Sequence, residues 1–306
     1  MHLTLMHISD LHAGPPFSTD KAELIIREAW ELKPDLMVLS GDMVQRADFT
    51  HHWRQIRAFI DQLPEPRLIV PGNHDIPMFN QVARYLWPFK RYKKYITPNL
   101  QPIAECEGLV AIGISTVRSF TIENGKLGRH KIAWLEQTLK RYGDDVCKVV
   151  VMHHHVVQPP GPATQKKDVI IGAPETLAAL DRGGAELVLC GHVHTSYIGN
   201  TLEFDPTLRQ GTIIAQSGTT TSRRGRLWQR GKNSFNIIEV EDQVIRISQR
   251  MFLEDAGRFV PVSEHVFPRR SGGAYYLPRQ ERVLEVSKTA QAIFPEPDSQ
   301  PVADAQ

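Results

Sequence analysis

Cysteine is scarce in this sequence of 306 residues. The three cysteines, Cys106, Cys147 and Cys190, are an odd number, and their spacing matches no metal-binding or redox motif. No apolar run approaches the roughly 18–20 residues that a membrane-spanning helix needs. Residues 1–6 lack the basic segment and the small-residue cleavage site of a signal peptide. These absences predict a cytoplasmic protein with reduced thiols and no transmembrane segment.

The sequence also lacks an excess of charge of either sign. Lys and Arg total 36 and Asp and Glu total 34, which gives a net charge of +2 with histidine neutral. A balanced total excludes neither phosphate ligands nor nucleic acid, because only local patches of charge indicate these. Hydrophobic residues make up 41% of the chain, enough for a substantial core. The abundant residue is histidine, which occurs 13 times and partly in clusters.

The first half of the chain alternates strand patterns with helix patterns. Short apolar runs at 3–8, 35–40 and 67–71 predict strands, and apolar residues recur at helical spacing over 19–33 and 50–63. This order favours right-handed crossovers and a largely parallel sheet.

The pattern becomes mixed in the middle and mostly β after residue 200. Further strands are predicted at 103–105, 109–115, 148–152, 186–190, 212–216, 234–240 and 243–250, and further helices at 129–142 and 174–182. The simplest fold is an α/β fold in which two packed mixed β-sheets form a sandwich flanked by α-helices. We expect one domain over 1–252 and a C-terminal extension over 253–306, with a short helix near 280–292 and a mobile tail over 294–306.

Five short polar motifs each follow a predicted strand. They are Asp10-Leu11-His12, Gly41-Asp42, Gly72-Asn73-His74-Asp75, His153-His154-His155 and Gly191-His192-Val193-His194. Because the carboxyl ends of strands in such sheets lie along one edge, we expect these motifs to converge there.

The residue types in these motifs suit a metal site. Carboxylate, imidazole and carboxamide groups bind borderline-to-hard divalent ions such as Mn, Fe, Zn or Co. The candidate ligands are Asp10, His12, Asp42, Asn73, one histidine of the triplet, His192 and His194. Seven ligands are too many for one ion, but two ions about 3.5–4 Å apart that share one carboxylate would use them all. Asp42 is the natural bridge, because a carboxylate has two oxygens with several lone pairs.

In this order, the five motifs resemble the signature of the calcineurin-like metallophosphoesterases, and the resemblance covers about residues 3–240. It implies a four-layer catalytic domain over 1–252 that binds two divalent metal ions, Mn or Fe first and Zn or Co as alternatives. It assigns Asp10, His12 and His194 to the first metal, Asn73, His153 and His192 to the second, and Asp42 to both. It also implies that His74 lies beside the scissile phosphate as a catalytic residue, and that Asp75 supports His74 or its loop.

The predicted function is that of a metal-dependent phosphoric ester hydrolase. Two cations would supply a bridging hydroxide for in-line attack on phosphorus, and His74 would assist the leaving oxygen. Within the family, the chain resembles the bacterial class III cyclic-nucleotide phosphodiesterases, which makes a small phosphodiester, with cyclic nucleotides as one candidate, the expected substrate. A nucleotide or lipid pyrophosphate hydrolase, a nuclease and a catalytically inactive binding scaffold stay open as alternatives. Nucleic acid is the less favoured partner, because no additional DNA-binding module is visible.

Several residues have more than one interpretation. In the histidine triplet, His153 is favoured as the ligand because it directly follows the apolar strand, and His154 or His155 would contact substrate or satisfy a loop. Arg118 and Arg223 are candidates for binding the substrate. The basic stretch of Arg223, Arg224, Arg226, Arg230 and Lys232 is interpreted either as an anion pocket near the site or as a solvated loop.

The segment 84–95 interleaves basic and aromatic residues. One interpretation is a surface for nucleic acid or anionic lipid. The other, which we favour from the sequence, is a helical insertion that packs its aromatic rings inward and leaves its charges in water.

Overall fold

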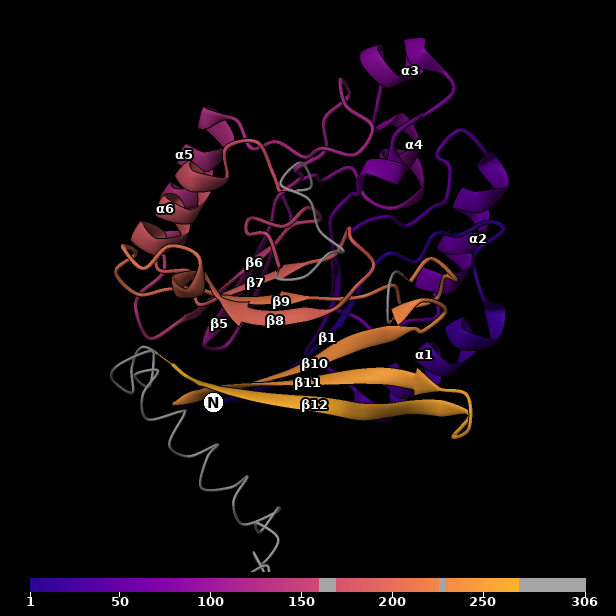
Figure 1. Ribbon diagram of the computed structural model, residues 1–306. Helices are drawn as coiled ribbons and strands as arrows, with labels where there is room; N and C mark the ends of the chain where they lie inside the picture. The colour runs from indigo at the N-terminus through magenta and orange to yellow at the C-terminus, as the bar shows by residue number, and fades with distance from the viewer. Residues whose placement is uncertain (160–168, 226–228, 270–306) are drawn as a thin grey trace, which may run out of the picture.

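The computed structural model describes residues 1–159, 169–225 and 229–269. In this part of the chain, two six-stranded sheets pack face to face, and helices cover their outer faces (Figure 1). The predicted sandwich of two mixed sheets flanked by helices is therefore confirmed. The helix expected near 280–292 and the tail over 294–306 lie outside the described residues.

The first sheet contains both ends of the described chain. Its strand order is β12-β11-β10-β1-β2-β3. The strands are β1 (His2–Ile8), β2 (Leu36–Leu39), β3 (Arg67–Ile69), β10 (Ser234–Glu241), β11 (Val244–Leu253) and β12 (Arg258–Pro268). β1, β2 and β3 are parallel, whereas β10, β11 and β12 join as antiparallel neighbours. β12 lies beyond residue 252, where the sequence suggested a boundary, and pairs with β11 along its length.

The second sheet has the strand order β4-β5-β6-β7-β9-β8. Its strands are β4 (Ile103–Cys106), β5 (Leu109–Gly113), β6 (Cys147–Val151), β7 (Leu187–Cys190), β8 (Tyr197–Asn200) and β9 (Ile213–Gln216). The four inner strands are parallel, and β4 and β8 pair antiparallel at the edges. The helices are α1 (Thr19–Leu32), α2 (Thr50–Ile60), α3 (Gln81–Leu86), α4 (Lys90–Tyr95), α5 (Arg129–Leu139) and α6 (Ala173–Gly183).

Side-chain alternation along the strands divides the core into three layers. Leu36 and Val38 of β2 belong to the cluster between the two sheets, whereas Met37 and Leu39 point the other way and pack with residues of α1 and α2. A third cluster lies between the second sheet and the pair α5 and α6. Because both faces of the inner strands are buried, these strands are continuous apolar runs, which is why the sequence marks them so clearly.

The basic and aromatic segment forms two short helices, and only one of them follows the favoured prediction. Tyr92 of α4 is fully buried, and its hydroxyl donates a hydrogen bond to the carbonyl oxygen of Ile69 at 3.1 Å. Tyr85 and Trp87, in and after α3, are 50% and 57% exposed. The prediction that the aromatic rings pack inward is therefore correct for α4 and wrong for α3. Within the described ranges, no helix combines the length and the hydrophobicity needed to cross a bilayer.

Candidate metal centre

All five motifs follow the carboxyl ends of parallel strands. The motifs that contain Asp10, Asp42 and Asn73 follow β1, β2 and β3 of the first sheet. Those that contain His153 and His192 follow β6 and β7 of the second sheet. Because the two sheets pack face to face, these ends meet at one rim, and the structure brings the seven predicted ligands together there.

One group of ligand atoms gathers around His194. Its Nε2 atom lies 2.9 Å from Nε2 of His12 and 3.1 Å from Oδ1 of Asp10. Oδ2 of Asp42 lies 3.6 Å from Nε2 of His12. These four side chains are buried, and each offers one ligand atom within 4.8 Å of the others. Two imidazole nitrogens and two carboxylates that point at one another form a donor set suited to a divalent cation.

A second group gathers around the carboxamide of Asn73. Its Oδ1 atom lies 3.1 Å from Nε2 of His153 and 3.1 Å from Nδ1 of His192. Oδ1 of Asp42 lies 3.4 Å from Nε2 of His153. Asp42 therefore presents Oδ2 to the first group and Oδ1 to the second, which is the geometry expected of a bridging carboxylate.

The backbone of these loops is unusual at the ligands themselves. Six non-glycine residues have a positive φ among the described ones, and five of them are predicted ligands: Asp10, His12, Asp42, His192 and His194. Two glycines make room for the carboxylates. A Cβ atom on Gly72 would collide with Oδ1 of Asp42, and one on Gly191 would collide with Oδ2 of Asp10. The glycines of these motifs are therefore required by close approach to the ligands.

Hydrogen bonds orient two of the ligand imidazoles. Nδ1 of His153 lies 2.8 Å from the carbonyl oxygen of Ser40, and Nδ1 of His194 lies 3.1 Å from that of Arg224. A carbonyl can only accept, so Nδ1 carries the proton in both rings. The Nε2 atom of each ring then faces the site and can bind a metal ion once it carries no proton, as in metal-ligating histidines.

The electrostatics of the site also favour cations. Burial opposes the ionisation of Asp10 and Asp42, but the surrounding imidazoles outweigh it and hold the pKa of each carboxyl well below its usual range. At His153, burial opposes the charged form, but the charges of Asp42 and Asp10 and the hydrogen bonds to Asp42 and Ser40 together outweigh it and raise the pKa of that imidazole to about 9. Oδ1 of Asp10 is buried and accepts no hydrogen bond from a described residue. The residues present therefore fit divalent metal ions.

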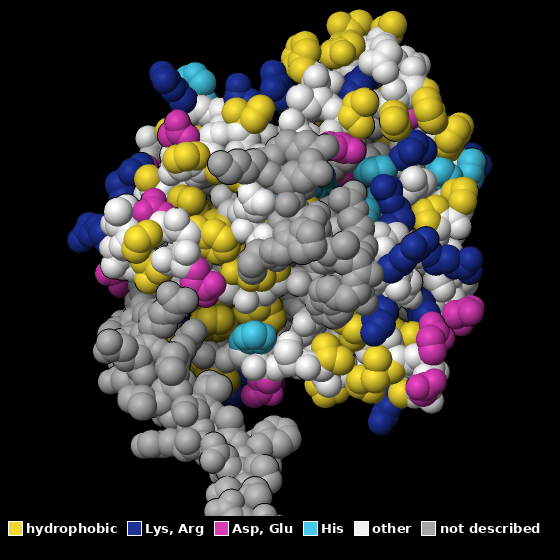
Figure 2. Space-filling model, in the orientation of Figure 1, with side chains coloured by type: hydrophobic (Ala, Val, Ile, Leu, Met, Phe, Trp, Pro, Cys, Tyr) yellow, Lys and Arg dark blue, Asp and Glu magenta, His cyan; other side chains and the backbone are white. Residues whose placement is uncertain are grey.

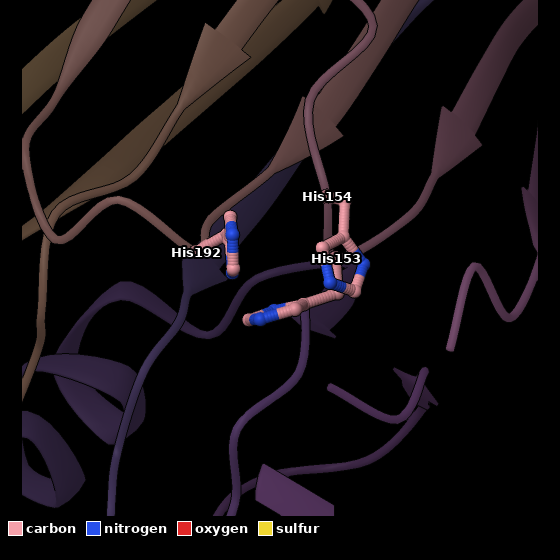
Figure 3. Close-up of side chains that lie close together, drawn as sticks. All are labelled: His153, His154 and His192. Atoms are coloured by element: carbon pink, nitrogen blue, oxygen red, sulfur yellow. The ribbon is translucent and has the colours of Figure 1, made fainter. Parts of the chain in front are cut away.

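His154 lies beside His153 and His192, with ring centroids 4.9 Å and 4.4 Å away, but its ring nitrogens are engaged elsewhere (Figure 3). One ring nitrogen of His154 lies 2.7 Å from the hydroxyl of Thr116, and the other lies 2.9 Å from the carbonyl oxygen of Glu123. Burial, followed by the charge of His153, holds the pKa of His154 well below its usual value. His154 therefore links the segments that contain Thr116 and Glu123. His153, not His154, faces Asn73 and Asp42.

His74 lies at the side of the first ligand group. Its Nε2 atom is 4.0 Å from Oδ2 of Asp42 and 3.1 Å from the guanidinium of Arg224, and its Nδ1 atom is 2.8 Å from the carbonyl oxygen of Gln45. The guanidinium of Arg46 lies 3.0 Å from the same Nδ1. Burial, together with these two cations, lowers the pKa of His74 despite the opposing charge of Asp42. His74 thus sits next to the ligands without joining either group.

Asp75 holds the loop rather than the imidazole of His74. Its two oxygens accept hydrogen bonds from the backbone N–H groups of Gly72 at 2.8 Å and Val44 at 3.1 Å. Burial, followed by repulsion from Asp42, raises the pKa of Asp75 to about 7. Of the two supporting roles expected for Asp75, the contacts favour support of the loop.

Two predicted substrate residues lie apart from the ligands. The guanidinium of Arg118 lies 5.8 Å from the ring of Phe120, and no hydrogen bond or ion pair joins it to a ligand among the described residues. The side chain of Arg223 is exposed, whereas the neighbouring Arg224 contacts His74. Arg224 belongs to the basic stretch considered as an anion pocket, whereas sequence reasoning missed Arg46, although its position four residues after Asp42, in the loop that follows β2, places it close to the site.

The geometry agrees with comparisons to known proteins. The profile of the family described as calcineurin-like phosphoesterase matches residues 3–196. The chain therefore belongs to the calcineurin-like phosphoesterase family, and this membership supports its prediction as a phosphoric ester hydrolase. Over 210 residues it is 27% identical to a probable cyclic nucleotide phosphodiesterase from Synechococcus sp., an alignment that covers 65% of this chain and 76% of the relative.

Two further proteins are similar. Over 170 residues, the chain is 27% identical to the glycerophosphodiester phosphodiesterase GpdQ of Enterobacter lignolyticus, covering 53% of this chain and 56% of that protein. The solved structure of PhoD superposes with a TM-score of 0.64 over 95% of this chain and 77% of PhoD. At 12% identity, the similarity to PhoD supports the fold alone.

Proposed function

We propose that this protein is a phosphodiesterase whose site holds two divalent metal ions, Mn or Fe, and acts on a small phosphodiester. The observation that carries the proposal is the position of Asp42, whose two oxygens face two separate groups of nitrogen and oxygen donors. Two of the similar proteins bear names of phosphodiesterases, and one of these names specifies cyclic nucleotides. Cyclic nucleotides are therefore the first candidate substrate.

Each part of the site has a role in this chemistry. When bound, two divalent cations neutralise the oxygens of a phosphodiester and make hydroxide available near neutral pH. Asp10, His12 and His194 would hold one ion, and Asn73, His153 and His192 the other. His74 would stand at the departing alkoxide and donate a proton or positive charge to it. Arg224 and Arg46 add positive charge beside His74, where a phosphate oxygen would lie.

Hydrolysis of bis-p-nitrophenyl phosphate tests whether the protein is an enzyme. We expect turnover by protein loaded with Mn²⁺, loss of turnover after chelation and dialysis, and recovery when Mn²⁺ or Fe²⁺ is added back. If metal-loaded protein hydrolyses no phosphoester, the proposal is wrong and a binding scaffold of the same fold becomes the better description.

A substrate panel on the same metal-loaded protein tests the substrate class. It contains cyclic nucleotides, nucleoside diphosphate derivatives, lipid pyrophosphates and single-stranded DNA. We expect the highest kcat/KM for a small phosphodiester. A higher value for a pyrophosphate would contradict the phosphodiesterase assignment, and a higher value for DNA would contradict a small phosphodiester as the substrate. Either result would leave the metal centre in place.

A further inference from the structure

Hydrophobic side chains gather on the outer surface of α3, at the opposite end of the molecule from α1 (Figures 1 and 2). Val82, Tyr85 and Leu86 recur at helical spacing on α3, and each is at least half exposed. Trp87, Phe120 and Ile122 are exposed to the same degree or more. These six residues form the apolar patch. A folded protein that leaves such large side chains in water at one place commonly uses them for binding.

Hydrogen bonds hold the two parts of the apolar patch together. The guanidinium of Arg84, which is buried beneath α3, donates to the carbonyl oxygens of Pro77, Ser119 and Thr121. The rings of Tyr85 and Phe120 lie 5.3 Å apart. The helix and the loop that carries Phe120 therefore form one fixed surface rather than two independent flaps.

The apolar patch lies close to the metal centre. The side-chain amide of the predicted ligand Asn73 donates a hydrogen bond to the carbonyl oxygen of Ile122 at 3.1 Å. A cavity beside His74 is lined by Met78, Arg84 and Ile122, which belong to the elements that carry the patch. A partner bound to the apolar patch would therefore lie next to the cavity beside His74.

The charge around the apolar patch is mostly positive, although Glu123 directly follows Ile122 and the carboxylate of Asp48 accepts a hydrogen bond from the backbone N–H of Met78. Residues 76–104 contain five basic residues and no Asp or Glu. Lys90, Lys93 and Lys94 on α4 are exposed, and the backbone N–H of Lys90 donates to the carbonyl oxygen of Trp87, which keeps this lysine next to the patch. Exposed aromatic and aliphatic side chains with lysines beside them are typical of surfaces that lie in the headgroup region of an anionic bilayer.

We propose that the apolar patch, with the lysines of α4, is a docking surface for an anionic lipid bilayer. The aliphatic members of the patch favour lipid over nucleic acid, because bases stack on aromatic rings and gain little from Val82, Leu86 or Ile122. A second copy of the chain is disfavoured, because a two-fold symmetric contact through this surface would bring two segments with a charge of +5 close together. The proposal is independent of the proposed function, because binding needs no turnover.

Co-sedimentation with vesicles tests the proposal on the full chain loaded with Mn²⁺. We expect binding to vesicles of equal parts phosphatidylglycerol and phosphatidylcholine, weaker binding at higher NaCl concentration, and little binding to phosphatidylcholine alone. Trp87→Ser should lower the partition coefficient about fivefold or more. The matched control is Trp30→Ser on α1, because Trp30 is 54% exposed but lies far from the patch, and it should bind as the unaltered protein does.

A second pair of variants tests the charge. Lys93→Gln with Lys94→Gln should weaken vesicle binding, and Arg141→Gln with Arg258→Gln, which removes the same charge from exposed sites elsewhere, should not. Phe120→Ser provides an independent test of the patch if Trp87→Ser fails to fold. The proposal is overturned by absence of binding to anionic vesicles, or by equal losses for Trp87→Ser and Trp30→Ser. A lipid-free dimer that Trp87→Ser dissociates, or DNA binding without vesicle binding, would also overturn it.

Discussion

Among the described non-glycine residues, the left-handed backbone conformation is concentrated at the candidate metal centre. A left-handed conformation costs a non-glycine residue about 1–2 kcal/mol, and five of the predicted ligands adopt it. Backbone hydrogen bonds hold the loops in place, as between the N–H of Asp10 and the carbonyl of Gly41 at 3.1 Å. The strain is concentrated where side chains must turn toward a common point, so it reflects the site rather than the fold.

Substitution of the bridging carboxylate should remove metal and activity together. Asp42→Asn takes one negative charge away from the point where the two ligand groups meet. We expect the purified variant to contain less than half of the metal of the unaltered protein by elemental analysis, and to lose activity in proportion. A variant that keeps full metal content would show that Asp42 does not bridge.

Substitution of His74 should instead separate activity from metal content. His74 joins neither ligand group, so His74→Ala should keep the metal while kcat falls by about 10²–10⁴-fold, the usual contribution of acid–base catalysis. His130→Ala, on the exposed face of α5, is the matched control and should leave kcat unchanged. Loss of metal from His74→Ala would mean that His74 is a ligand after all.

The convergence of the seven predicted ligands could be expected from the sequence because their motifs each follow an apolar strand, in an order that independent turn residues would not reproduce. Which arginines contact His74 could not be predicted. Arg223 and Arg224 are identical in type and adjacent, and only the backbone of the loop decides that Arg224 turns inward. The exposure of Trp87 could not be predicted either, because the sequence does not show which aromatic rings pack against other side chains.

At the scale of elements, the inner strands and the long helices follow from periodicity, and their ends shift by only a few residues. β8 and β12, which lie at the edges of the two sheets, were not predicted from the sequence. β8 is four residues long, and β12 contains Pro261 and leaves much of one face in water. Edge strands of this kind carry a weak pattern because only one side of the backbone is paired.

In the loop after β7, replacing Gly191 by alanine should weaken metal binding. In Gly191→Ala, the new Cβ atom would meet the hydroxyl of Ser9 and the carboxylate of Asp10, so this carboxylate must move. We expect metal affinity to fall about 10–100-fold, as for other changes that misplace a ligand. Gly128→Ala is the control, since no atom lies within 4 Å of its Cβ position. Equal affinities of the two variants, measured by metal titration, would contradict this account.

The ion pairs that Glu136 of α5 makes with Arg182 of α6 and with Lys140 at the end of α5 should make stability depend on pH. Hydrogen bonds from Arg182 and then Lys140 lower the pKa of Glu136 from 4.5 to about 2. A lowered pKa means that the stabilisation is complete above about pH 4.5 and is lost as the pH falls toward 2.

Glu136→Gln should therefore be less stable than the unaltered protein at pH 6, by at most about 1 kcal/mol, because the cationic partners are half exposed. Urea denaturation at a series of pH values measures this difference, which should shrink below pH 4.5. A difference that stays constant down to pH 2 would show that the ion pairs are not its cause.

At the scale of the whole molecule, the metal centre joins the two sheets. Asp10, His12, Asp42 and Asn73 follow strands of the first sheet, and His153, His192 and His194 follow strands of the second. Each ligand group contains residues from both sheets, so ions bound there would cross-link the sandwich at one rim. Without such ions, buried carboxylates and imidazoles face one another with incomplete hydrogen bonding, which disfavours the packed state.

Removal of metal should therefore lower the stability of the entire fold rather than loosen one loop. An ion present at about 100 times its dissociation constant stabilises the folded state by about 2.7 kcal/mol, which corresponds to a shift in Tm of about 5–10 °C for a chain of this size. We expect calorimetry to show this shift when Mn²⁺ is added to chelator-treated protein. Asp42→Asn is the control, because a variant that cannot bridge the ions should respond weakly. If both proteins gain equally, Mn²⁺ acts elsewhere on the surface and the two sheets are not joined through this centre.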